Sequence, residues 1–132
     1  MLNPFPDLLV LGFFAPTLVR VAAGSLFLYV SYLHWKGRAS ICQTRFPIIG
    51  QGEWIAWASV AVHLGLGASL FFGYYTQIGA LVGSIAAMKG ILFSGMYRSA
   101  FPYSRSTYAL LLAICLSLLL SGAGAFAFDL PL

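Results

Sequence analysis

Charged residues are scarce in this chain. Only 8% of its 132 residues are Asp, Glu, Lys or Arg, whereas 61% are hydrophobic. In ordinary soluble domains roughly a quarter of the residues are charged. A soluble fold of this length could not cover so many apolar side chains with so few polar ones. We therefore expect lipid to surround most of the chain.

The residues that carry most enzyme chemistry are equally few. The two cysteines, Cys42 and Cys115, are too isolated for a metal site, and we expect no disulfide between them. The only carboxylates are Asp7, Glu53 and Asp129, which argues against a proton-relay pump, because such a pump usually needs an acid within the membrane. The sequence has no phosphate-binding loop and no nucleophile beside a base. We therefore expect no self-contained catalytic site.

Long apolar runs are what the chain has instead. Four of them give candidate spans at residues 16–35, 54–73, 76–95 and 107–123. About 20 apolar residues in a helix cross a bilayer, and a helix satisfies its own backbone hydrogen bonds there. The sequence thus predicts an all-α integral membrane four-helix bundle, with residues 1–132 as a single domain.

Basic residues outside the spans gather in two of the three loops: Lys36, Arg38, Arg45, Arg98 and Arg105. With four spans, loops one and three lie on the same side, and the positive-inside rule makes that side cytoplasmic. Both termini then lie on the non-cytoplasmic side, and we expect a bacterial inner membrane. The net charge of +4 suits topology and anionic lipid rather than nucleic acid, because the charges are dispersed beside the spans.

Arg20 is a cation in the first span. Pro16 suits a first helical turn, so a helix of residues 16–35 places Arg20 about one turn from the outer interface. From there its guanidinium could extend outward to water, and the Pro16 start favours this interpretation. The alternative is a buried Arg20 whose partner is a carbonyl, an anionic ligand or another subunit.

Small residues recur every four positions in the second and third spans. The two series are Ala61, Gly65, Ser69 and Gly73, and Gly79, Gly83 and Ala87. Such series let helix backbones approach closely in lipid. We expect these two spans to form a tight antiparallel hairpin packed along both series.

His63 lies near the middle of the second span, on a face pointing away from this hairpin contact. It could hydrogen-bond a neighbouring helix, contact a quinone, or ligate the metal of a haem or chlorophyll-type pigment, for which Ser59 leaves space. A bis-histidine haem is not expected, because we place His34 about 15 Å from His63.

Lys89 lies within the third span and needs a counter-ion. Glu53 is the one carboxylate predicted on its side of the membrane. We therefore expect an ion pair between Glu53 and Lys89, or a water-filled pocket that joins them.

Three stretches give the chain a resemblance to the DoxX-like membrane proteins. "LVRVAAGSLFLYVSYLHW" resembles their Arg-x3-Gly first helix, "HLGLGASLFFGYYTQIGAL" their second helix and turn, and "SGAGAFAFD" their Gly-x-Gly ending. The residues that match are Arg20, Gly24, Gly122, Gly124 and Asp129. Three positions depart from the family pattern: His63 replaces an acid, Gln77 a basic residue, and Ala123 the proline within Gly-x-Gly.

The resemblance implies four helices and a role with redox proteins, since some DoxX-like proteins are subunits of thiosulfate:quinone oxidoreductase. Our first hypothesis is an accessory membrane subunit of a larger electron-transfer complex, respiratory or photosynthetic in type. The second is a quinone-reactive subunit of an oxidoreductase, in which His63 or Lys89 hydrogen-bonds a quinone carbonyl. A small-solute transporter is less favoured, because no broken helices or internal repeats are evident.

Overall fold

The computed structural model describes residues 12, 14–44, 50, 52–98, 100–122, 124 and 126–128. Its helices are α1 (Ala15–Lys36), α2 (Arg38–Gln43), α3 (Glu53–Phe72), α4 (Thr76–Phe93) and α5 (Arg105–Ser121). The described part of the chain contains no β-strand, so the all-α prediction is confirmed. The four long helices match the four predicted spans to within two residues at each end. The short helix α2, within the first loop, was not predicted.

Local sequence explains where these helices begin and end. Pro16 lies in the first turn of α1, as expected. Gly73 ends α3 with φ 71°, a left-handed conformation that glycine adopts without a steric penalty. The hydroxyl of Ser104 accepts a hydrogen bond from the backbone N–H of Thr107 and caps the start of α5.

Helices α1, α3 and α4 are long and apolar enough to cross a membrane, and α5 is apolar and 17 residues long. At 1.5 Å per residue α5 spans about 25 Å, close to the thickness of the hydrocarbon core. The protein is therefore an integral membrane protein built of apolar helices. On which side its termini lie stays a prediction.

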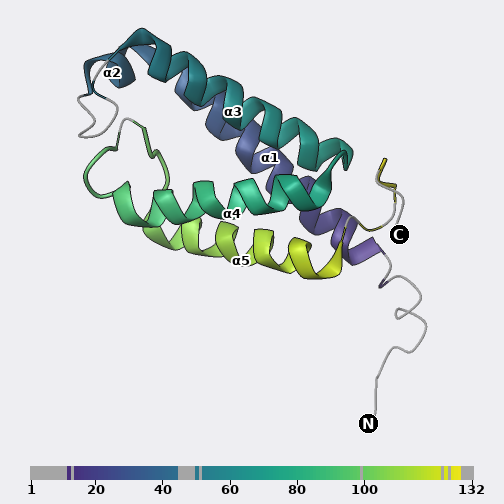
Figure 1. Cartoon of the computed structure of the whole chain (residues 1–132). Helices are drawn as coiled ribbons and strands as arrows, with labels where there is room; N and C mark the ends of the chain where they lie inside the picture. The colour runs from purple at the N-terminus through teal and green to yellow at the C-terminus, as the bar shows by residue number, and fades with distance from the viewer. Residues whose placement is uncertain are drawn as a thin grey trace.

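The helices form two packed pairs, α1 with α3 and α4 with α5 (Figure 1). The closest approach joins α1 and α3 at Gly24 and Gly67. A Cβ atom added to Gly24 would lie 2.7 Å from the backbone nitrogen of Phe71, and one added to Gly67 would lie 2.7 Å from that of Leu28. Only glycine permits this crossing.

The predicted tight hairpin of α3 and α4 was wrong. A Cβ atom added to Gly65 would have no heavy atom within 4 Å, so no helix packs closely against this glycine at its Cβ position. Gly83 instead packs against Phe27 of α1 and Cys115 of α5. Near the turn, Gly79 does approach the side chains of Ser69 and Leu70 of α3. The spacing of small residues correctly indicated close packing but did not indicate which helix is the partner.

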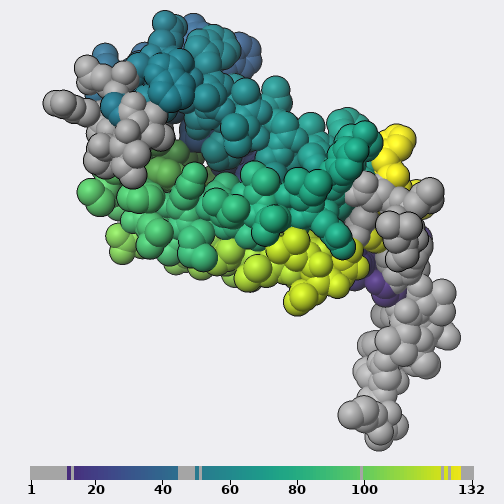
Figure 2. Space-filling model, in the orientation of Figure 1, coloured from purple at the N-terminus to yellow at the C-terminus, as the bar shows by residue number. Residues whose placement is uncertain are grey.

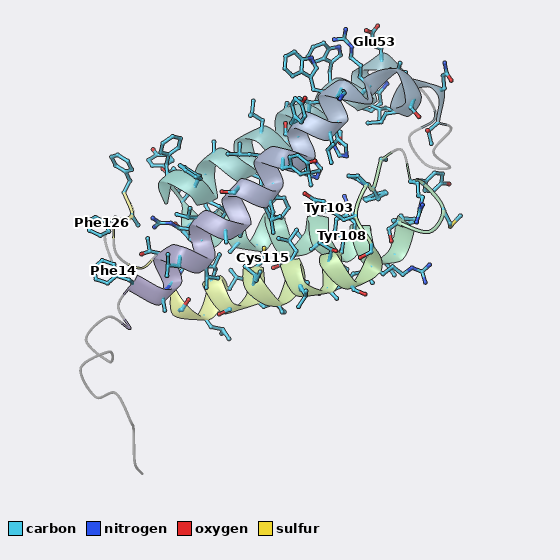
Figure 3. All side chains as sticks on the ribbon, turned by 180° about the vertical axis from the view of Figure 1, so that it is seen from behind. Phe14, Glu53, Tyr103, Tyr108, Cys115 and Phe126 are labelled. Atoms are coloured by element: carbon cyan, nitrogen blue, oxygen red, sulfur yellow. The ribbon has the colours of Figure 1, made fainter. Side chains whose placement is uncertain are left out.

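The two pairs meet at the end that holds the α3–α4 turn, which we call the narrow end. Arg20 is 2% exposed there, and its Nη2 donates a hydrogen bond to the carbonyl oxygen of Phe126, 3.1 Å away. Its guanidinium also packs against Gly73, where a Cβ atom would overlap it. The rings of Phe14 and Phe126 stack 5.8 Å apart (Figure 3). The C-terminal segment therefore folds back onto the start of α1 and the end of α3.

Arg20 is thus buried, and the interpretation that extended it to water was wrong. Of the partners considered for a buried Arg20, the structure provides a carbonyl. Side-chain direction alone could not reveal this burial, because the covering segment is more than 100 residues away in sequence. Asp7 and Asp129, expected on the same side of the membrane, lie outside the described residues.

At the opposite end, which we call the wide end, the pairs separate (Figure 1). The segment of residues 100–103 fills the space between α1 and α5. The carbonyl of Ala100 lies 2.8 Å from Nε2 of His34, and the ring of Tyr103 stacks 6.4 Å from that of Tyr29. Burial raises the pKa of Tyr103, and the nearby Tyr29 hydroxyl adds to the shift, so the phenol stays protonated.

Candidate functional site

A cavity of about 490 Å³ lies at the wide end, between α3 and α4. We call it the α3–α4 cavity. Figure 2 shows the surface hollowed between these helices. Its walls are mostly apolar and aromatic, with polar groups from His34, Ser59, His63, Lys89 and Tyr97. Pockets for small molecules typically measure about 300–1,000 Å³ and combine an apolar lining with a few polar groups.

The two histidines lie side by side on one wall of this cavity. Their ring centroids are 4.8 Å apart, with the rings nearly perpendicular at 88°. The expected separation of about 15 Å was wrong. Helical side chains lean toward the N-terminus of their own helix. Because α1 and α3 run in opposite directions, His34 leans inward and His63 leans outward, and the two rings converge.

Ser59 connects the two histidines. Its Oγ lies 2.9 Å from Nδ1 of His34, and its carbonyl oxygen lies 2.8 Å from Nδ1 of His63. A carbonyl oxygen can only accept a hydrogen bond, so His63 donates from Nδ1–H. By the same argument His34 donates from Nε2–H to the carbonyl of Ala100, and its Nδ1 accepts from the Ser59 hydroxyl.

These tautomers give the two rings different roles. Both nitrogens of His34 are used within the protein, so His34 orients Ser59 and the loop rather than a ligand. In neutral His63, Nδ1 carries the hydrogen, which leaves Nε2 with a free lone pair. His63 can therefore accept a hydrogen bond from a ligand hydroxyl, but in this form it cannot donate one to a ligand carbonyl.

Lys89 provides the positive charge of the cavity. It is exposed on α4 and lines the wall that faces α3. Its ammonium carries three hydrogen-bond donors and no acceptor. The cavity thus combines a cationic donor, Lys89, with a neutral acceptor, His63, inside an apolar lining.

The predicted Glu53–Lys89 ion pair was wrong. Glu53 is exposed at the first residue of α3, and Figure 3 shows it at the end of the molecule, away from the space between the helix pairs. It does not line the cavity that contains Lys89. The first side chain of α3 leans outward, whereas Lys89 on α4 leans toward the bilayer centre, so the two diverge.

The structure brings His63 and Lys89 together and leaves Arg20 elsewhere. Arg20 contacts Gly73 and Phe126, neither of which lines the α3–α4 cavity. His63 was expected to point away from α4, but the two helices diverge enough for it to share a cavity with α4 residues. The contacts of Ser59 with both histidines were not predicted from the sequence, which indicated only that Ser59 leaves space beside His63.

Comparison with known families supports this architecture. The sequence pattern of the DoxX family matches residues 15–95, which include α1, α3 and α4. The chain belongs to the DoxX family. No curated protein and no solved structure gives a significant match to it. The family match includes every residue that lines the α3–α4 cavity except Tyr97, Ala100 and Phe101.

Within the described residues, no three His, Cys, Asp or Glu side chains gather as metal ligands would. A tetrapyrrole ligand at His63 would use Nε2, because Nδ1 already donates to Ser59. Lys89 can donate a hydrogen bond and His63 can accept one, so a small molecule with oxygen atoms that form hydrogen bonds uses both groups, whereas a tetrapyrrole metal would use only His63.

Proposed function

We propose that this DoxX-family protein is a membrane subunit of an electron-transfer complex and binds a quinone in the α3–α4 cavity. The observation that carries the proposal is the pairing of Lys89 and His63 in an apolar cavity between two membrane helices. A quinone ring is flat and apolar with two carbonyl acceptors, so it needs such a lining together with a donor.

Lys89 and His63 suit different redox states of this ligand. The Lys89 ammonium donates a hydrogen bond to a carbonyl oxygen of the oxidised ring and stabilises the negative charge that reduction places there. Nε2 of His63 accepts a hydrogen bond from the hydroxyl of the hydroquinone, which carries two added electrons and two added protons. The hypothesis that His63 donates to the quinone carbonyl is replaced by this one.

A partner subunit supplies the electrons in this proposal. The absence of a self-contained catalytic site in the sequence motivates an accessory role, as does the exposed outer face of α3. Gentle extraction from native membranes should yield this chain together with redox proteins. Purification as a solitary, monodisperse chain would contradict the accessory role.

The wide end faces the cytoplasm in this proposal, as the basic loops predict. Cys42, in α2, is partly exposed at this end, whereas Cys115 is buried in the helix core. We expect a membrane-impermeant maleimide to label Cys42 only after the cells are permeabilised. Labelling of intact spheroplasts would reverse the orientation.

Quinone binding can be tested on the purified chain by fluorescence. Trp54 lines the cavity, so a variant with Trp35→Phe and Trp57→Phe retains one reporter that a bound quinone quenches. Hydrogen bonds to charged groups contribute about 1.5–3 kcal/mol, so Lys89→Met should weaken quinone binding about tenfold or more. Lys36→Met, at the end of α1 and outside the cavity, is the matched control.

Two results would overturn the proposal. One is saturable binding that Lys89→Met and His63→Ala both leave unchanged. The other is quinone-linked turnover of the native assembly that neither substitution alters.

A further inference from the structure

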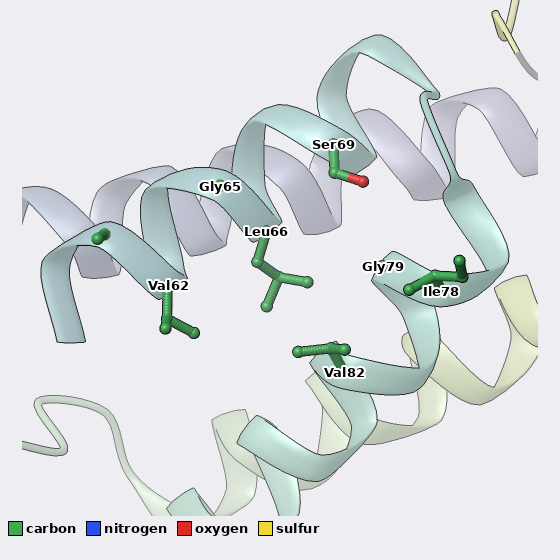
Figure 4. Close-up of a pocket in the computed structure, with 8 residues that line it drawn as sticks. Val62, Gly65, Leu66, Ser69, Ile78, Gly79 and Val82 are labelled. Carbon is green, nitrogen blue, oxygen red and sulfur yellow. The ribbon is translucent and has the colours of Figure 1, made fainter. Parts of the chain in front are cut away.

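A second hollow lies between α3 and α4, closer to their turn. We call it the α3–α4 groove. It measures about 290 Å³ and is lined by Ala61, Val62, Gly65, Leu66, Ser69, Ile78, Gly79 and Val82 (Figure 4). The lining is apolar apart from Ser69, whose hydroxyl donates to the carbonyl of Tyr74 and is thereby satisfied within the protein. The single polar side chain of this lining has its hydrogen already donated within the protein, so the groove suits a hydrocarbon.

The groove adjoins the α3–α4 cavity. Val62 of α3 and Val82 of α4 line both. The two adjacent hollows place Lys89 and His63 at one end and a mainly apolar lining at the other. From Val62 to Ser69 the groove follows α3 for about 10 Å. A ligand that extends across both hollows would combine a polar ring with a hydrocarbon chain several carbons long.

We propose that the α3–α4 groove holds the first isoprene units of the tail of the quinone whose ring lies in the α3–α4 cavity. This inference rests on the proposed function and adds a selectivity: the protein prefers a long-chain quinone to the same ring without a tail. In a bilayer or micelle the tail is already in hydrocarbon, so shape complementarity rather than the hydrophobic effect provides the preference.

Gly65 is the position at which the groove can be filled. An added Cβ atom there meets no heavy atom within 4 Å, so the first side-chain atom is accommodated, and we expect a larger side chain to occupy groove space. Gly79 is unsuitable, because its Cβ atom would lie 3.1 Å from the Ser69 hydroxyl. Gly65→Leu is therefore the test variant, and Ala61→Leu, from the same lining, is the second.

The experiment uses the full chain in detergent with Trp54 as the reporter. Two probes are compared at equal micellar concentration: a quinone with several isoprene units and the same ring without its tail. The unsubstituted chain should bind the long-chain probe several-fold more tightly. Gly65→Leu and Ala61→Leu should lose this preference and retain affinity for the tail-less ring. Ala22→Leu, on an exposed position of α1 outside both hollows, should retain both properties.

The outcomes separate this inference from the proposed function. If the tail-less ring binds but the long-chain probe has no advantage, or if both groove variants keep that advantage, the tail assignment is wrong and the quinone function stands. Phospholipid that copurifies with the unsubstituted chain but not with Gly65→Leu would assign the groove to an acyl chain instead and overturn the inference. If neither quinone binds, both proposals fail.

Discussion

Two cations within the spanning helices lie at opposite ends of the molecule in opposite environments. Arg20, at the narrow end, is 2% exposed, packs against the end of α3 and donates to the carbonyl of Phe126. Lys89, at the wide end, is exposed to a cavity. The narrow end surrounds its cation with protein, whereas the wide end leaves its cation accessible to a ligand.

The difference indicates that the cation at the narrow end stabilises the fold, whereas the cation at the wide end is available to bind a ligand. The guanidinium of Arg20 lies at the C-terminal end of α3, where the helix dipole favours positive charge, and it joins this helix to the C-terminal segment. Such a group stabilises the fold. Lys89 forms no hydrogen bond or ion pair with the residues that the structure describes, and its side chain lines a cavity, so its charge is available for binding. The following predictions test this division through the free energy of unfolding, measured by SDS titration in mixed micelles.

The largest effect should come from the crossing of α1 and α3. An added Cβ atom at Gly67 lies 2.7 Å from the Leu28 backbone and cannot be accommodated without moving a helix. Overpacking of this kind costs up to about 3 kcal/mol, and we expect Gly67→Ala to approach that value. Gly65→Ala, two residues away on the same helix, should change little. Equal effects at both positions would contradict the described crossing.

Arg20→Met should be the next most destabilising substitution, by about 2 kcal/mol. It removes a charge-assisted hydrogen bond and leaves the Phe126 carbonyl without its donor. Arg98→Gln, on an exposed residue at the other end, is the control and should have a small effect. If Arg20→Met has the same free energy of unfolding as the unsubstituted chain, the packing of the narrow end does not depend on Arg20.

Ser59→Ala should cost about 1 kcal/mol, since interhelical hydrogen bonds in membrane proteins contribute about 0.6 kcal/mol on average and at most about 1.7 kcal/mol. The substitution removes the donor to His34 but leaves the carbonyl that holds His63. Ser25→Ala is matched to it, because the Ser25 hydroxyl bonds only within α1. A Ser59→Ala effect no larger than that of Ser25→Ala would argue that His34 is not held by this contact.

The smallest effect on stability should be that of Lys89→Met, within about 0.5 kcal/mol, although the same substitution should weaken quinone binding. Arg20→Met should therefore lower the free energy of unfolding much more than Lys89→Met does. If Lys89→Met lowers the free energy of unfolding as much as Arg20→Met does, Lys89 has a structural role. The assignment of stability to the narrow end and binding to the wide end would then be wrong.

The four long helices could be predicted because their cause is local. Long apolar runs, Pro16 at a first turn and Gly73 at a last turn act within a few residues, and the helices begin and end close to the expected positions. Small residues such as Gly83 also correctly indicated close packing. A periodic series of small residues indicates that another helix packs closely against it. It does not indicate which helix, because any helix of suitable shape can pack there.

The amino-acid sequence is thus sufficient to predict an all-α integral membrane protein and to single out Arg20, His63 and Lys89 as residues that can pair with or bind other groups. The folded structure was needed to show that Arg20 is buried, that His34 meets His63, and that Lys89 shares a cavity with His63 rather than an ion pair with Glu53. Lipid solvates the apolar surface of every helix about equally well, so the hydrophobic effect does not select which helices pair. Helix pairing then depends on close backbone contacts such as Gly24 with Gly67, and these contacts determine which distant polar side chains meet.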